Sequence, residues 1–118
     1  MSVILYGIPN CDTVKKARAW LTGQGVAYRF HDFKKDGVPA GHVDQWIGQM
    51  GWERLLNRKG LAWRKLDTAT QEQVRDSDSA KAVMLAQPSV IKRPVVEWSA
   101  KKITVGFDEA AWALLAGA

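Results

Sequence analysis

The first 33 residues constrain the fold more than any other part of this sequence, because two apolar segments flank an amphipathic one. Residues 3–6 are rich in strand formers, and Gly7 and Pro9 end this segment. A helix of about three turns is predicted to start close to Cys11, because apolar residues then recur at helical spacing, at Val14, Ala17 and Leu21. Residues 26–33 read as a second strand. This order predicts a βαβ unit with two parallel strands.

Cys11 is the only cysteine of the sequence and lies in the polar turn where the helix is predicted to begin. The unsatisfied N–H groups and the positive end of the helix dipole stabilise a thiolate there, so the pKa of the thiol should fall. A lone cysteine can equally be a small buried hydrophobe without reactivity. The local pattern leaves both interpretations open, and a basic group from elsewhere in the chain would favour the reactive one.

The middle of the chain, about residues 38–87, has a helical composition. Helical segments are predicted at residues 40–51, 52–56 and 70–75, and from a cap at Ser77 or Asp78 to Pro88. A third strand should follow Pro94 and a fourth should cover residues 103–105. Asp108 should cap a last helix, with its apolar face at Ala111, Trp112 and Leu115. The sequence therefore predicts an α/β fold with a mixed four-strand sheet, in a single domain spanning residues 1–118 with a helical insertion at about 38–87.

The composition is that of an ordinary globular protein, with 118 residues, 47% of them hydrophobic and 25% charged. No apolar run approaches a membrane span and no signal peptide is recognised, so we expect a cytoplasmic protein without a membrane partner. One cysteine cannot form an internal disulfide, which fits a reducing compartment. Together with two distant histidines, His31 and His42, it makes no metal-ligand set.

The formal charge of +5 could indicate an anionic partner. The basic residues are spread along the chain in pairs and are not gathered on one element, so direct nucleic-acid binding is not expected. Six tryptophans are many for this length. Five of them have apolar neighbours in predicted helices or strands and should pack in or near the core, whereas Trp63 is left open. His31, on a strand beside Asp32, is interpreted as structural.

Five motifs are spread over almost the whole chain. They are Tyr-Gly-Ile-Pro-Asn-Cys-Asp-Thr-Val-Lys-Lys-Ala from Tyr6, Leu-Leu-Asn-Arg-Lys-Gly from Leu55, Arg-Lys-Leu from Arg64, Ile-Lys-Arg-Pro from Ile91 and Val-Gly-Phe from Val105. With these motifs the sequence resembles the arsenate reductase (ArsC) family and its Spx and YffB relatives. It is most similar to the YffB-type proteins, which are regarded as glutathione-dependent thiol reductases. The resemblance implies a thioredoxin-like fold with an inserted helical region, in agreement with the order of elements above.

The resemblance also implies a reactive site. Cys11 would be the nucleophile, Arg93 its cationic neighbour and Pro94 a cis proline that faces the thiol. Arg93 could lower the pKa of the thiol and hold a carboxylate of glutathione in two-point fashion. Further candidates for binding glutathione are Asn10, Lys15, Asn57, Arg58 and Pro94.

The sequence departs from its relatives in two respects. Arsenate reductases carry further arginines that hold the oxyanion, but one of these aligns with Asn57, beside Arg58, and another falls near Val105, where no cation stands. Arsenate reduction is therefore expected to be weak or absent. Spx regulators have a second cysteine three residues after the first, and this chain has Val14 there, which excludes a switch by an internal disulfide.

The predicted function is that of a cysteine-based, glutathione-dependent thiol–disulfide oxidoreductase. Its partners would be small-molecule thiols or disulfides, with glutaredoxin as a further candidate, and it would need no metal. Two alternatives stay open at this point. The chain could be a Spx-like regulatory protein that binds RNA polymerase, or a true arsenate reductase.

Overall fold

The computed structural model describes residues 3–117, which form two compact units. The sheet unit combines the chain up to Asp36 with the chain from Arg93 onward, and the helical unit comprises Gly37–Lys92. In the described part of the chain, none of the helices has the length and apolar character that crossing a membrane requires.

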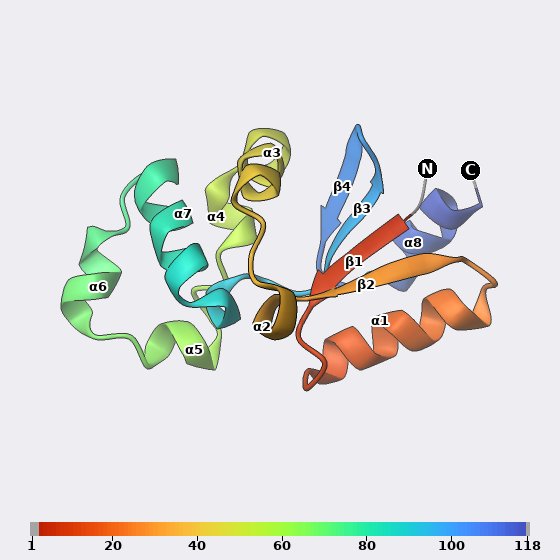
Figure 1. The fold of residues 1–118 in the computed structure, drawn as a ribbon, viewed down its shortest axis with the longest axis horizontal. Helices are drawn as coiled ribbons and strands as arrows, with labels where there is room; N and C mark the ends of the chain where they lie inside the picture. Colours follow the sequence, from red (N-terminus) through yellow and green to blue (C-terminus); the bar gives the residue numbers. More distant parts are fainter. Residues whose placement is uncertain (1–2, 118) are drawn as a thin grey trace. The chain divides into compact units, whose positions relative to one another are not determined.

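The sheet unit contains one mixed four-stranded sheet (Figure 1). Its strands are β1 (Val3–Gly7), β2 (Tyr28–Asp32), β3 (Val95–Ser99) and β4 (Lys102–Val105), in the spatial order β2-β1-β3-β4. The central strand β1 is parallel to β2 and antiparallel to β3, and β3 is antiparallel to β4. The predicted βαβ unit and mixed sheet are confirmed, and their order is that of the thioredoxin-like fold.

Two helices pack on one face of this sheet. Helix α1 (Asp12–Gly23) connects the parallel strands, and α8 (Glu109–Ala116) follows β4. The buried cluster between sheet and helices consists of Leu5, Val14, Ala17, Leu21, Val96 and Trp112. The indole of Trp112 meets Phe107 and Trp98 edge-on, at centroid distances of 4.8 and 5.1 Å. Such edge-to-face pairs add to the free energy gained by burial, so they help to hold α8 against the sheet.

The opposite face of the sheet carries a second aromatic group. Tyr6 points there because it alternates with Leu5 along β1, and its hydroxyl donates a hydrogen bond to Glu97 of β3 at 2.8 Å. Burial, followed by the hydrogen bond and charge of Glu97, raises the pKa of Tyr6, so the hydroxyl stays protonated as a donor. His31 and Phe33 pack beside Tyr6, at centroid distances of 4.9 and 6.2 Å. This packing agrees with the structural interpretation of His31.

The helical unit is built from short helices around a small core (Figure 1). They are α3 (Ala40–Met50), α4 (Trp52–Leu55), α5 (Leu61–Arg64), α6 (Thr68–Gln73), α7 (Ser77–Ala86) and the 3₁₀ turn η1 (Pro88–Val90). A bridge between Leu56 and Ile91 joins the middle of this unit to its end. Lys92 donates its backbone N–H to the Leu55 carbonyl at 2.8 Å, and Asn57 donates to Val90 at 2.8 Å. The segment that leads to Arg93 is thereby anchored within the helical unit.

The packing of the helices confirms most of the predicted apolar positions. Ala80, Val83 and Met84 of α7 are buried, as are Val43 and Trp46 of α3. All six tryptophans are buried or half-buried, which includes Trp63, the one left open.

Three sequence predictions are corrected by the structure. The second strand covers Tyr28–Asp32 and not residues 26–33; it ends at Asp32 because the Asp32 carboxylate accepts hydrogen bonds from the N–H groups of Lys34 and Lys35 and starts helix α2 (Phe33–Asp36). The cap of α7 is Asp76, which forms a reciprocal capping box with Ser79, so neither Ser77 nor Asp78 caps this helix. Asp108 caps α8 as predicted, but Ala111 is exposed and only Trp112 of this helix is buried.

We expect Tyr6→Phe to lower the free energy of unfolding by about 1.5 kcal/mol, because it removes the hydrogen bond of a buried tyrosine to a carboxylate. Tyr28→Phe is the matched control. The Tyr28 hydroxyl accepts a hydrogen bond from Arg18 at 3.0 Å but is half-exposed, so water replaces that bond. Urea unfolding measures both. Equal effects of the two substitutions would contradict a special role of the Tyr6–Glu97 bond.

Candidate active site

Cys11 lies at the junction between β1 and α1, as the sequence predicts. Its backbone is extended, with φ −142° and ψ 122°, and it occupies the position just before the first helical residue, Asp12. The Cys11 carbonyl already accepts the N–H of Lys15 at 2.9 Å, which is the first bond of the helix. The N–H groups of the first turn have no carbonyl partner within the helix and are therefore available to the thiol.

The thiol of Cys11 is half-buried and its pKa is lowered. Burial is the largest single influence and raises the pKa of Cys11, because it disfavours the charged form. Four favourable interactions with the thiolate outweigh it: the N–H of Val14, the hydrogen bond and the charge of the Arg93 side chain, and the N–H of Thr13. The helix N-terminus and one arginine thus stabilise the thiolate together.

Arg93 reaches the thiol from a distant part of the sequence. It lies directly before β3, and the Arg93–Pro94 peptide bond is cis, as predicted. Pro94 is buried, and its carbonyl accepts the N–H of Gly106 at 2.9 Å. This bond ties the start of β3 to the end of β4. The sheet therefore holds the backbone that carries Arg93.

The other candidate residues occupy different surroundings. Asn10 and Lys15 are exposed near Cys11 in the sequence, but the Lys15 charge is not among the influences that lower the pKa of the thiol. Asn57 and Arg58 belong to the helical unit. Asn57 is half-buried in a tight turn with Gly60, whose N–H donates to the Asn57 carbonyl at 3.3 Å.

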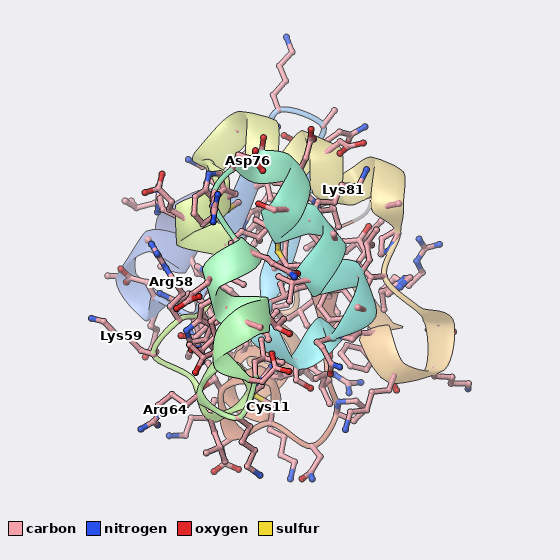
Figure 2. All side chains as sticks on the ribbon, turned by 90° about the vertical axis from the view of Figure 1, so that its left-hand side faces the viewer. Cys11, Arg58, Lys59, Arg64, Asp76 and Lys81 are labelled. Atoms are coloured by element: carbon pink, nitrogen blue, oxygen red, sulfur yellow. The ribbon has the colours of Figure 1, made fainter. Side chains whose placement is uncertain are left out.

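Arg58 lies in an exposed basic part of the helical unit. Its guanidinium is 5.4 Å from the centre of the Trp52 ring, within the range of a cation–π contact. Figure 2 shows the side chains of Arg58, Lys59 and Arg64 on one flank of this unit, pointing outward. All three are exposed, and they form a solvated basic surface.

Two contributors to the site were not singled out from the sequence. The N–H groups of Thr13 and Val14 both stabilise the thiolate, and neither side chain takes part. The sequence indicated backbone donors near Cys11 without naming them, because a helix predicted to start at Cys11 must direct its first N–H groups toward that position. Only the structure shows which two of them act on the sulfur.

The described residues contain no group of three or more His, Cys, Asp or Glu side chains that could hold a metal ion. A cavity of about 380 Å³ opens in the helical unit between α6 and α7. It is lined by Leu66, Thr70, Gln73, Val74, Ser79, Ala82, Val83, Ala86 and Gln87. Because none of these side chains titrates near neutral pH, the cavity offers no acid, base or thiolate.

A model of the ArsC family matches residues 6–115, almost the whole chain. The chain belongs to the ArsC family. The solved structure of the YffB protein superposes with a TM-score of 0.92 and 46% identity, covering 98% of this chain and 99% of that one. An ArsC-related protein from Brucella melitensis shares 49% identity at a TM-score of 0.74, over 97% of this chain and 93% of its own. These neighbours establish the arsenate reductase-like, thioredoxin-like fold.

Two further comparisons concern curated relatives. An uncharacterised protein from Haemophilus influenzae is 36% identical over 107 residues, which cover 91% of this chain and 92% of that protein. The global transcriptional regulator Spx of Streptococcus pyogenes serotype M3 is 26% identical over 109 residues, 91% of this chain and 79% of its own. The family thus includes proteins described as arsenate reductase-related and proteins described as regulators.

We expect the rate of Cys11 alkylation by iodoacetamide to reach half its maximum at a pH below about 8.5, the value of a free thiol. The thiolate is the reactive form, so reactivity is lost as the pH falls through the lowered pKa of Cys11. Cys11 is the only thiol, which makes the assay specific.

Arg93→Gln should shift this midpoint upward, because it removes the positive charge that stabilises the thiolate. Lys16→Gln is the matched control, since Lys16 is an exposed cation of α1 that does not act on the sulfur. A wild-type midpoint at or above the pKa of a free thiol, about 8.5, would show that Cys11 is not an activated thiol.

Proposed function

We propose that the protein is a thiol–disulfide oxidoreductase in which Cys11 is the nucleophile and glutathione is the external thiol. One observation supports this proposal above all: Cys11 stands at the N-terminus of helix α1, where the first-turn N–H groups and Arg93 lower the pKa of its thiol. That arrangement raises the fraction of thiolate above that of a free thiol, and the thiolate is the form that attacks disulfides.

In the first step the Cys11 thiolate attacks one sulfur of a disulfide RS–SR′. A Cys11–S–SR bond forms, the S–S bond of the substrate breaks, and R′S⁻ leaves and takes up a proton from water. The leaving thiolate departs from a site that already stabilises negative charge on sulfur. Arg93 and the N–H groups of Thr13 and Val14 are therefore placed to act on the charge as it moves between the two sulfurs.

The second step needs a thiol from outside, because the printed sequence contains no second cysteine. A glutathione thiolate attacks the mixed disulfide, forms GS–SR and restores the Cys11 thiolate. Glutathione also carries two carboxylates, and the planar guanidinium of Arg93 suits one of them in a two-point contact. We assign Asn10, Lys15 and Pro94 to the same binding region on the sheet unit; Asn57 and Arg58 lie in the helical unit.

Two other functions follow from specific comparisons. Similarity to the Spx regulators supports a regulatory interaction protein that binds RNA polymerase. The chain has Val14 where the second cysteine of those regulators is expected, so any regulation through Cys11 would again require an outside thiol. Similarity to an ArsC-related protein supports arsenate reduction. Direct assays of thiol exchange, of RNA polymerase binding and of arsenate turnover distinguish the three.

Incubation with oxidised glutathione should add one glutathione to Cys11, detected by mass spectrometry of the intact protein and of its peptides. Arg93→Lys should fold normally but form the adduct roughly tenfold more slowly, because an ammonium does not hold a carboxylate at two points and loses a charge-assisted hydrogen bond. Cys11→Ser is the negative control. Failure of the wild-type protein to form any adduct, while its thiol alkylates rapidly, would reject glutathione as the partner.

Arsenate turnover with glutathione should be weak or absent. Val105 and Asn57 offer no cation at positions where arsenate reductases are expected to hold the oxyanion, and each missing donor costs on the order of 10²–10³ in rate. An established arsenate reductase, assayed in parallel, provides the positive control. Robust turnover by this protein would show that another cation, such as Arg58, replaces the missing arginines.

A further inference from the structure

Gly7, the last residue of β1, has no room for a side chain. A Cβ atom at this position would lie 2.8 Å from one γ-carbon of Val14 and 3.4 Å from the other. Contacts below 3.0 Å between such atoms essentially do not occur, so a larger residue would have to displace Val14. Gly23, at the other end of α1, has nothing within 4 Å of the same position.

Glycine is required at position 7 because there is no space for a side chain, and not because of its backbone conformation. Positive φ values occur in the described chain only at Gly25, Gly37, Gly51 and Gly106, so the backbone of Gly7 is one that other residues adopt freely. Leu5 and Gly7 point to the same face of β1, because side chains alternate along a strand. Helix α1 covers that face, and its first turn occupies the volume that a side chain of Gly7 would take.

Val14 cannot give way without moving the helix. Its side chain is completely buried in the cluster that joins α1, the sheet and Trp112. A β-branched residue in a helix is also restricted to one strongly preferred χ1 rotamer. A methyl group added at Gly7 would therefore push the first turn of α1 away from β1, and the backbone of Val14 would move with it.

Cys11 directly precedes the first turn of α1, so the backbone N–H groups of that turn, with Val14 among them, point toward the thiol and lower its pKa. We propose that Gly7 is a positioning residue for Cys11: the missing side chain lets the first turn of α1 approach β1 closely, which places the N-terminus of this helix beside the Cys11 sulfur. This inference rests on the proposed function of Cys11 as a reactive thiolate. It adds a residue that touches neither substrate nor sulfur.

Three variants of the full-length protein test the proposal, with the pKa of Cys11 measured from the pH dependence of iodoacetamide alkylation. Gly7→Ala should raise the pKa by about one unit, because a hydrogen bond to a charged group is worth about as much free energy as one pKa unit. The double variant Gly7→Ala/Val14→Ala removes the γ-carbons that clash and should restore most of the wild-type value. Gly23→Ala, the matched control on the same helix, should leave the pKa unchanged.

The outcomes separate this inference from the proposed function. A lowered pKa in the wild-type protein that persists in folded Gly7→Ala would overturn the positioning role and leave the proposed function standing. An ordinary pKa in the wild-type protein would reject both. Thermal unfolding of each variant identifies a purely structural effect, which would change the melting temperature and not the pKa.

If Gly7→Ala does not fold, Val14→Ile replaces it in the test. This substitution enlarges Val14, the other residue of the same contact. A rise in the pKa of Cys11 supports the proposal, and an unchanged pKa overturns it.

Discussion

The end of β1 and the first turn of α1 are in close contact beside Cys11, through Gly7 and Val14. Val14 takes part in it twice, since its side chain is buried in the core and its backbone N–H stabilises the thiolate. The buried cluster around Leu5 and Trp112 holds α1 in place, so the donors are supplied by a rigid element and not by a mobile loop. A thiolate stabilised by fixed dipoles needs no rearrangement of the protein when its charge appears or disappears.

Burial acts on this thiol in two directions. By itself it raises the pKa of Cys11, because a half-buried thiolate loses water. The same loss of water strengthens each hydrogen bond and charge that reaches the sulfur. The balance is favourable only because several donors converge, from α1 on one side and from Arg93 on the other. Loss of even one donor should therefore raise the pKa of Cys11 and lower the reactivity of its thiol.

Proteins with this fold are described both as arsenate reductase-related and as transcriptional regulators. The fold alone does not determine which of these activities a protein has, because activity depends on the particular residues at sites on the shared fold. This chain has a single cysteine, and the family resemblance aligns Val14 with the second cysteine of Spx and the uncharged Asn57 and Val105 with oxyanion-binding arginines. These differences are the ones that the proposed exchange with an outside thiol takes into account.

Local patterns in the sequence determined the elements around the site. Helical spacing from Val14 to Leu21 and the break at Gly7 placed Cys11 at a helix start, because both signals depend on near neighbours in the chain. The end of β2 at Asp32 and the cap at Asp76 were missed, since side chain to backbone hydrogen bonds compete with propensity at such ends. Arg93 was connected to Cys11 only through the family resemblance. Its place beside the sulfur, and the contact that requires glycine at position 7, were decided by the tertiary structure, because strand order and helix packing bring together residues that no local pattern relates.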